Sequence, residues 1–357
     1  MRLGRVIVLF LTAFAVLQGS DAVSEVGPLP DGASYAALKP ASWNQRRLLL
    51  IAPAQRADSS PVAAVLDSSS PLVRMLLADG WLVATLGYRR PGIVLKDSLD
   101  DLHRLRAVLA DRHGPADRVY VLGEAMGGAV AVRLIENHPD DYAGALAAGG
   151  SFDLQEPAPT VGVTFSPGRP LLLLPNQSES YAPELYIRAA AAAPVPPVLW
   201  RVGRDGRTNI NAAEKHAALQ ALVRWVESGT VPSANFDATV PPPDQPSLAT
   251  FSSDRSTATA RVRSIEPVRG DLVLEFQPRD LEQAGVARGT WFALVLGNGR
   301  VIRTLYGQNL RDARRLDWMA LPEAEGWMIF SAHRGNAAAI SGLRVGDPVS
   351  IRRLAGD

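Results

Sequence analysis

Residues 120–128 read Tyr-Val-Leu-Gly-Glu-Ala-Met-Gly-Gly, and this stretch decides the fold of the first half of the chain. An apolar strand end leads into a Gly-x-Ala-x-Gly turn, which is followed by a helix-forming run at 129–136. The glycines allow the backbone to turn sharply from strand to helix, so that the middle residue is presented at the edge of a sheet. That middle residue is Ala125, whose methyl group carries no reactive atom.

Short apolar runs and amphipathic helices alternate on both sides of this turn. Strands are predicted at 48–52, 82–86, 119–122, 145–148, 171–174 and 198–202, and their almost continuous apolar character is typical of strands buried on both faces. Helices are predicted over 97–112 and over 211–228, where Asn211 and Glu214 have the spacing of a capping box. The alternation predicts a doubly wound, mostly parallel sheet covered by helices.

The pattern changes at residues 230–257, which contain three consecutive prolines at 241–243 and a run rich in serine, threonine and aspartate. Consecutive prolines favour an extended, stiff linker. After it, short strands are predicted at 262–268, 272–276, 291–296, 301–305, 327–331 and 349–352. We therefore expect a first domain over 23–229 and a small β-barrel over 258–357, which is a common size for a domain.

The first 22 residues have the pattern of a cleaved signal peptide. Arg2 and Arg5 precede an apolar run at 6–17 that is too short to span a bilayer, and Ser20 and Ala22 are small residues at the positions that a signal peptidase reads. The alternative is an N-terminal membrane anchor. We expect a periplasmic or secreted protein that contacts a membrane only through the signal peptide before cleavage.

Composition excludes several classes of function. The chain of 357 residues has a formal net charge of +1 and no long block of like charges, so no nucleic-acid partner is expected. It has no cysteine, which excludes disulfides and thiolate chemistry. Its five histidines show no ligand spacing with one another or with carboxylates, so the sequence supports no metal site and implies no cofactor.

Residues 40–230 resemble the α/β-hydrolase superfamily, and especially its secreted branch. The matching stretches are Trp43-Asn44, Gly87-Tyr88-Arg89, Lys96-Asp97, the turn at 123–128, His138-Pro139-Asp140 and the helix at 213–226. In this superfamily the turn is the nucleophile elbow. The resemblance implies an α/β-hydrolase fold. Only about 20 residues separate the strands at 145–148 and 171–174, so no cap domain is expected there.

The triad positions all differ from the superfamily pattern. Ala125 stands at the nucleophile position and Arg207 at the position of the basic histidine, and Glu179 is the nearest match to the acid. A methyl group cannot attack a carbonyl, and an arginine stays protonated and cannot accept the proton of a nucleophile. We expect Arg207 and Glu179 to form a structural ion pair over the elbow.

The oxyanion loop also differs from the pattern. Pro53 and Ala54 replace the His-Gly pair of the superfamily. Proline has no N–H, so one candidate donor to an oxyanion is lost, and the Met126 amide is the donor that remains. Simultaneous replacement of nucleophile, base and oxyanion loop indicates a natural pseudoenzyme, because an engineered knock-out would change the nucleophile alone.

Residues 268–353 resemble the C-terminal β-domain of S-adenosylmethionine hydroxide adenosyltransferases and the related fluorinase. The resemblance rests on residues 326–338 and 342–347. In that family the domain helps to hold the nucleoside, which implies weak ligand-binding positions at Gly326, Trp327, His333 and Asn336. In this chain Ala324 and Glu325 stand where the family has a polar pair before its glycine, and the family's catalytic N-terminal domain is absent. The alternative is a structural barrel that packs on the first domain.

Together these observations predict a secreted pseudohydrolase that binds an unknown small molecule or protein. One alternative is an esterase- or peptidase-type hydrolase with an unorthodox site, which would use Glu179 or a nearby serine (Ser151, Ser178 or Ser180). A second alternative is a nucleoside-binding module that acts through the barrel.

Overall fold

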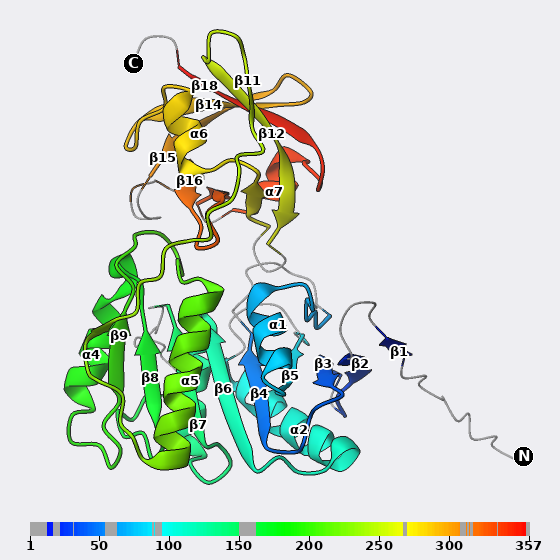
Figure 1. Cartoon of the computed structure of the whole chain (residues 1–357), viewed down its shortest axis with the longest axis vertical. Coiled ribbons are helices and arrows are strands. Elements are labelled where there is room, and N and C mark those ends of the chain that lie inside the picture. Colours follow the sequence, from blue (N-terminus) through cyan, green and yellow to red (C-terminus); the bar gives the residue numbers. More distant parts are fainter. Residues whose placement is uncertain are drawn as a thin grey trace, which may run out of the picture.

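The computed structural model of the chain describes residues 13–16, 22–30, 32–53, 63–87, 89, 95–149, 162–266, 270–307, 312, 314, 317–333 and 335–354. Two domains follow one another along the chain, and Figure 1 shows the second stacked on one end of the first. The first is built on a ten-stranded sheet, and the second on an eight-stranded sheet, as counted over the described residues.

The sheet of the first domain is mostly parallel, as predicted. Its strand order is β1-β2-β3-β5-β4-β6-β7-β8-β9-β10, in which β1, β2, β3 and β5 pair antiparallel and every pairing from β5 to β10 is parallel. The strands are β1 (Ala13–Val16), β2 (Ala22–Pro28), β3 (Ser34–Pro40), β4 (Arg47–Ala52), β5 (Leu82–Leu86), β6 (Arg118–Glu124), β7 (Gly144–Ala148), β8 (Leu171–Leu174), β9 (Val198–Arg201) and β10 (Phe236–Asp237).

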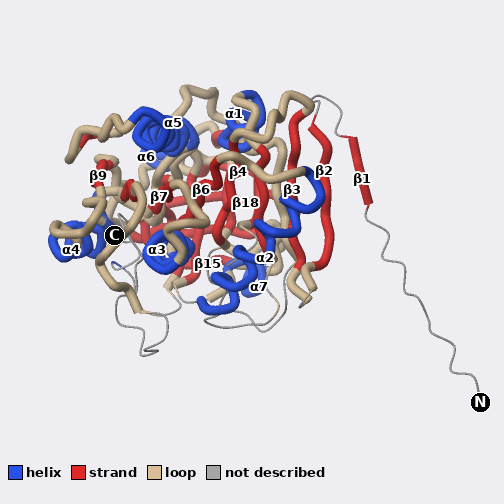
Figure 2. Tube along the Cα trace, turned by 90° about the horizontal axis from the view of Figure 1, so that it is seen from below, coloured by secondary structure: helices blue, strands red, loops and turns tan. Residues whose placement is uncertain are grey.

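Helices cover both faces of this sheet. Figure 2 shows α1 (Pro71–Ala78) and α5 (Ala212–Ser228) on one face, and α2 (Leu95–His113), α3 (Met126–Asn137) and α4 (Tyr181–Ala189) on the other. Each face has its own apolar core, because alternate side chains of the same strands point to opposite sides. The capping box predicted for α5 is confirmed: the Asn211 side chain accepts from the Glu214 amide at 2.9 Å, and Glu214 accepts from the Asn211 amide.

The turn between β6 and α3 has the geometry of a nucleophile elbow. Ala125 has φ 48° and ψ −118°, a conformation that costs a residue with a side chain about 1–3 kcal/mol. A β-carbon on Gly123 would lie 2.0 Å from the carbonyl oxygen of Gly127, and one on Gly127 would lie 2.5 Å from that of Ala52. The two glycines are therefore required by the close approach of α3 to β6 and β4.

The second domain is a closed barrel of seven strands with one extra strand at its side. The order β12-β13-β17-β16-β15-β14-β18 closes through a further pairing of β12 with β18, and β11 adds to β12. Three phenylalanines, Phe276, Phe292 and Phe330, form part of its core. The elements are β11 (Thr250–Phe251), β12 (Thr257–Ile265), β13 (Leu272–Leu274), α6 (Pro278–Gln283), β14 (Trp291–Leu296), β15 (Val301–Tyr306), β16 (Trp318–Pro322), β17 (Met328–Ala332), α7 (Ala337–Ser341) and β18 (Pro348–Arg353).

The predicted linker is held by hydrogen bonds to both domains. It contributes β10 to the first sheet and β11 to the second. Between them, the Val240 amide donates to Glu214 Oε1 at 2.7 Å, and the Val240 carbonyl accepts from Arg204 at 2.7 Å and Asn211 at 2.9 Å. Further on, Gln245 bonds to Glu325 and Gln277 of the barrel.

The N-terminal and cap predictions fall largely on residues outside the described part. Of the expected signal peptide, 1–12 and 17–21 lie outside it, while β1 and Ala22 are described and Ala22 is buried. The segment between β7 and β8, where no cap is expected, includes the undescribed residues 150–161. Among the described helices, none combines the length and apolar character that a membrane span requires.

The close contact at Gly123 predicts the effect of adding one methyl group. Gly123→Ala should lower the free energy of unfolding by about 2–3 kcal/mol, because the new β-carbon would overlap the backbone of α3, which cannot move without displacing the sheet. Urea denaturation of the full chain, followed by circular dichroism, measures the change.

Gly162→Ala is the matched control, since nothing lies within 4 Å of its added β-carbon and its φ is not positive. This variant should stay within about 0.5 kcal/mol of the unaltered chain, or be slightly stabilised. Equal stability of the two variants would contradict the packing described for the elbow.

Candidate functional site

The three predicted triad positions lie at the carboxyl edge of the first sheet. Ala125 follows β6, Glu179 ends a short 3-10 turn after β8 (Gln177–Glu179), and Arg207 lies in the loop after β9. Their chain order is that of nucleophile, acid and base in α/β-hydrolases. The end of β7 lies between the first two positions. The Ala125 amide donates to the carbonyl of Ala148 at 2.9 Å, and a β-carbon on the next residue, Gly149, would lie 3.3 Å from Glu179 Oε2.

The nucleophile position holds a buried methyl group. Ala125 is 5 % exposed, and its backbone keeps the left-handed φ of the elbow. The side chain presented there can pack and cannot attack a carbonyl carbon. The backbone therefore has the conformation of a nucleophile elbow, but the side chain at its centre has no nucleophilic atom.

The acid position still contacts the loop that would carry the base. The Thr208 amide donates to Glu179 Oε2 at 2.9 Å, and Thr208 has a positive φ of 45°. The side chain at the base position, Arg207, turns toward other partners as well. Burial lowers the pKa of Arg207, while the charges of Asp271, Glu179 and Glu266, in decreasing order of effect, favour its protonated form.

Glu179, the expected partner of Arg207, is one of three carboxylates whose charges act on this guanidinium. Asp271, which has the strongest effect on Arg207, precedes β13 of the barrel and is itself buried. Burial raises the pKa of Asp271, and the Ser331 hydroxyl and Arg207 oppose that shift. Among the ion pairs of 4 Å or less in the described residues, none joins Arg207 to Glu179.

The oxyanion positions are described in part. Pro53 follows β4 and is half-buried, and its carbonyl oxygen would lie 3.1 Å from a β-carbon on Gly127. It thus faces the start of α3 with a carbonyl oxygen and has no N–H to offer. Met126, at the first position of α3, is half-buried, and Ala54 lies outside the described residues.

The barrel covers this edge through the turn between β16 and β17, residues 323–327. Glu325 Oε1 accepts from the amide of Ala212, the first residue of α5, at 2.9 Å. The side chain of Asn209 donates to the Pro322 carbonyl at 3.2 Å. Both first-domain partners belong to the segment after β9, so the barrel contacts the carboxyl edge of the sheet, as Figure 1 shows.

Lys215 interacts with one carboxyl group of each domain beside the elbow, Glu124 and Glu323. Lys215 of α5 forms an ion pair with Glu124, the residue before Ala125, at 2.8 Å. Burial raises the pKa of Glu323 on the barrel turn to about 7. The Glu325 carboxylate adds to this rise, and backbone N–H groups and Lys215 oppose it. A carboxyl group with such a pKa in a contact between domains is a candidate for acid–base chemistry or for a structural proton switch.

Three of the four barrel positions implied by the second resemblance make contacts within the chain. Gly326 faces the linker, with Pro242 3.5 Å from its built β-carbon, and the ring of the buried Trp327 lies 4.7 Å from the Arg263 guanidinium. Asn336 caps α7 by accepting from the Ala339 amide at 2.8 Å. His333 is half-buried, and its Nδ1 has no hydrogen-bond partner in the described part. A nucleoside site here stays a prediction.

Comparison with known proteins supports the fold of the first domain. The sequence model of the serine aminopeptidase family (S33) matches residues 93–191, which include the elbow and the strand before Glu179. The strand order and the positions of the elbow and of the acid and base loops agree with this match. The first domain has the α/β-hydrolase fold. No curated protein sequence matches the chain.

Solved structures with some similarity are distant. An esterase of Pyrococcus furiosus is 15 % identical, with 56 % of this chain and 85 % of that chain covered and a TM-score of 0.37. A brefeldin A esterase, described as a bacterial homologue of human hormone-sensitive lipase, is 16 % identical over 61 % and 79 %, with a TM-score of 0.38. An uncharacterized conserved protein from Thermotoga maritima is 13 % identical over 26 % and 35 %, with a TM-score of 0.25, so the chain spans about a third of that protein.

Sequence reasoning missed the barrel residues that approach the elbow. Asp271, Glu323 and Glu325 lie more than 60 residues beyond the base loop, and no local pattern marks them as neighbours of Arg207 or Lys215. The one available signal was an arginine, Arg207, at the position assigned to the base, since a half-buried guanidinium needs nearby anions.

The raised pKa of Glu323 predicts how stability depends on pH. Because its pKa rises from 4.5 to about 7 on folding, its contribution to stability is present below pH 4.5 and is lost as pH rises through 7. Glu323→Gln removes this dependence, so at pH 8 the variant should be more stable than the unaltered chain by about 2–3 kcal/mol, and at pH 4.5 close to it. Urea denaturation at the two pH values measures the difference.

Glu282→Gln is the matched control, because Glu282 lies on the same domain and its side chain is exposed. It should change stability equally at both pH values. A Glu323→Gln variant with the same pH dependence as the unaltered chain would show that this carboxyl group is not desolvated in the contact between domains.

Proposed function

We propose that this chain is a non-catalytic protein of α/β-hydrolase fold that acts by binding a small molecule or a protein. The observation that carries the proposal is Ala125 itself: the elbow is built, including its strained φ of 48°, and it presents a methyl group. Removing the nucleophile of a serine protease costs about 10⁶-fold in turnover, so this single replacement is enough to remove ordinary hydrolase activity.

The neighbouring positions support the same conclusion. Acyl transfer needs a base close to the nucleophile, and Arg207 keeps its proton at physiological pH. It also needs N–H donors for the oxyanion, and Pro53 offers none. The barrel turn reaches this edge of the sheet, where Glu325 accepts from the Ala212 amide of α5 and the charge of Lys215 acts on Glu323. The edge that binds substrate in a hydrolase serves here as the contact between two domains.

One observation favours the rival proposal of a hydrolase with an unorthodox site. Glu323, with a pKa of about 7, could take or give a proton near the elbow at neutral pH. Of the serines considered, Ser178 is held structurally: its Oγ accepts from the Gly206 amide at 2.8 Å and donates to the Gly206 carbonyl at 3.1 Å. Ser180 begins α4, and Ser151 lies outside the described residues.

Export to the periplasm or the exterior is part of the proposal and rests on the residues of the expected leader. If cleavage follows Ala22, strand β1 is removed and β2 becomes the edge of the sheet. The absence of cysteine is compatible with an oxidising compartment.

An esterase assay separates the two proposals. The unaltered full chain should not hydrolyse short-chain nitrophenyl esters above the rate in buffer, and Ala125→Ser should also fail, because the protonated Arg207 at the position of the base cannot accept the proton of the new serine. Ala125→Gly is the matched control without a nucleophile, and a fluorophosphonate probe should leave all three proteins unlabelled.

Turnover by the unaltered chain that disappears in Glu323→Gln would establish the rival proposal. Turnover or labelling that appears with Ala125→Ser alone would show that a base survives at the elbow, which would contradict the loss of the triad.

A further inference from the structure

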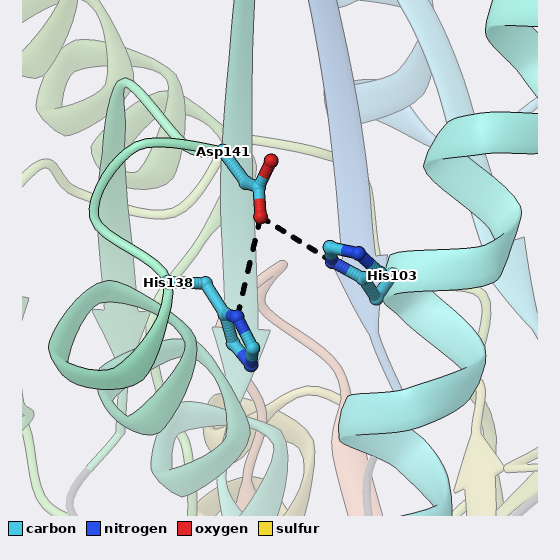
Figure 3. A group of neighbouring side chains, drawn as sticks. All are labelled: His103, His138 and Asp141. Atoms are coloured by element: carbon cyan, nitrogen blue, oxygen red, sulfur yellow. Dashed lines mark ion pairs between the residues drawn. The ribbon is translucent and has the colours of Figure 1, made fainter.

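Three side chains with metal-binding atoms meet on the helical face formed by α2 and α3, away from the elbow. His103 lies in the middle of α2, His138 caps the C-terminal end of α3, and Asp141 lies in the loop that leads to β7. Figure 3 shows both imidazole rings turned toward the same carboxylate. One donor atom from each residue lies within 4.8 Å of the other two.

The distances are those of atoms arranged around a shared cation. His103 Nδ1 lies 3.6 Å and His138 Nδ1 4.0 Å from Asp141 Oδ2. Both separations are too long for a hydrogen bond. Ligand atoms about 2.0–2.2 Å from a tetrahedral Zn²⁺ lie about 3.4 Å from one another, so a modest approach of the three side chains would bring these atoms into coordination.

A neighbouring guanidinium orients the Asp141 carboxylate toward the two imidazoles. Arg106 binds the other oxygen of Asp141, Oδ1, at 2.6 Å, which holds the carboxylate with Oδ2 toward the histidines. The Nδ1 atom of His103 is buried without a hydrogen-bond partner among the described residues.

The other histidine–carboxylate contacts of the chain differ from this group. His216 Nε2 lies 2.7 Å from Asp79 Oδ2, and His113 Nε2 lies 2.9 Å from Glu25 Oε2. Each is an ordinary hydrogen bond between one imidazole and one carboxylate. In the described part of the chain, only the group of His103, His138 and Asp141 offers three donor residues at metal-binding separation.

We propose that His103, His138 and Asp141 bind one divalent transition-metal ion, with Zn²⁺ as the best match to two imidazoles and one carboxylate. Their side chains are 42 %, 44 % and 30 % exposed, so the ion keeps an open position for water or an added ligand. Such an ion joins the middle of α2 to the end of α3. No local spacing marks this group, because the two histidines are 35 residues apart (138 − 103).

Calorimetric titration of Zn²⁺ into the untagged, chelator-treated full chain tests the proposal. We expect saturable binding of one Zn²⁺ per chain, weakened at least about tenfold by His103→Ala and by His138→Ala. His216→Ala is the matched control, since it removes a partly exposed histidine that faces a single carboxylate, and it should leave the affinity unchanged. Circular dichroism verifies that each variant is folded.

Nuclear magnetic resonance of the imidazole nitrogens provides a measurement that needs no variant. Zn²⁺ should shift the signals of His103 and His138 and leave that of His216 in place. The proposal is overturned if no saturable binding occurs up to about 1 mM Zn²⁺, if the His103 and His138 variants bind as tightly as the control, or if the shifted signals belong to other histidines.

Discussion

The charge of Arg207, held between the two domains, is the constraint on which the arrangement of the molecule depends. A guanidinium removed from water needs anions around it, and here they come from both sides of the contact: Glu179 from the first domain, and Asp271 and Glu266 from the second. Glu325 adds a hydrogen bond to the first amide of α5, and Glu323 lies near Lys215. The loop after β9 that carries Arg207 thus takes part in the contact between the domains.

The elbow shows why the fold of this chain does not depend on the chemistry of the side chain at its centre. The backbone of Ala125 keeps a strained conformation although no nucleophile benefits from it. Gly123 and Gly127 explain its persistence, because the contacts of α3 with β6 and β4 allow no other path for the chain. The packing of α3 on the sheet determines the conformation of the turn, whereas catalysis would constrain only the side chain at its centre. Replacement of the central side chain therefore need not disturb the fold.

The sequence predicted those parts of the structure that local pattern determines. The buried strands β5, β8 and β14 have the predicted bounds, because continuous apolar runs mark them. Strands β2 and β3 were missed, since β2 alternates between buried and exposed residues and both pair antiparallel. The triad positions were found through one resemblance. The approach of Asp271 and Glu323 to the elbow, and of His103 to Asp141, depends on tertiary packing between distant segments, which no spacing in the sequence encodes.

The amide of Ala212 tests most directly whether the barrel rests on the carboxyl edge of the sheet. It donates to Glu325 of the barrel, whereas the nearby Glu214 amide donates to Asn211 within the first domain. We predict that hydrogen exchange at Ala212 is slow in the full chain and at least about tenfold faster in Glu325→Ala, while exchange at Glu214 is unchanged. Rapid exchange at Ala212 in the unaltered chain, or no effect of the variant, would contradict the covered site.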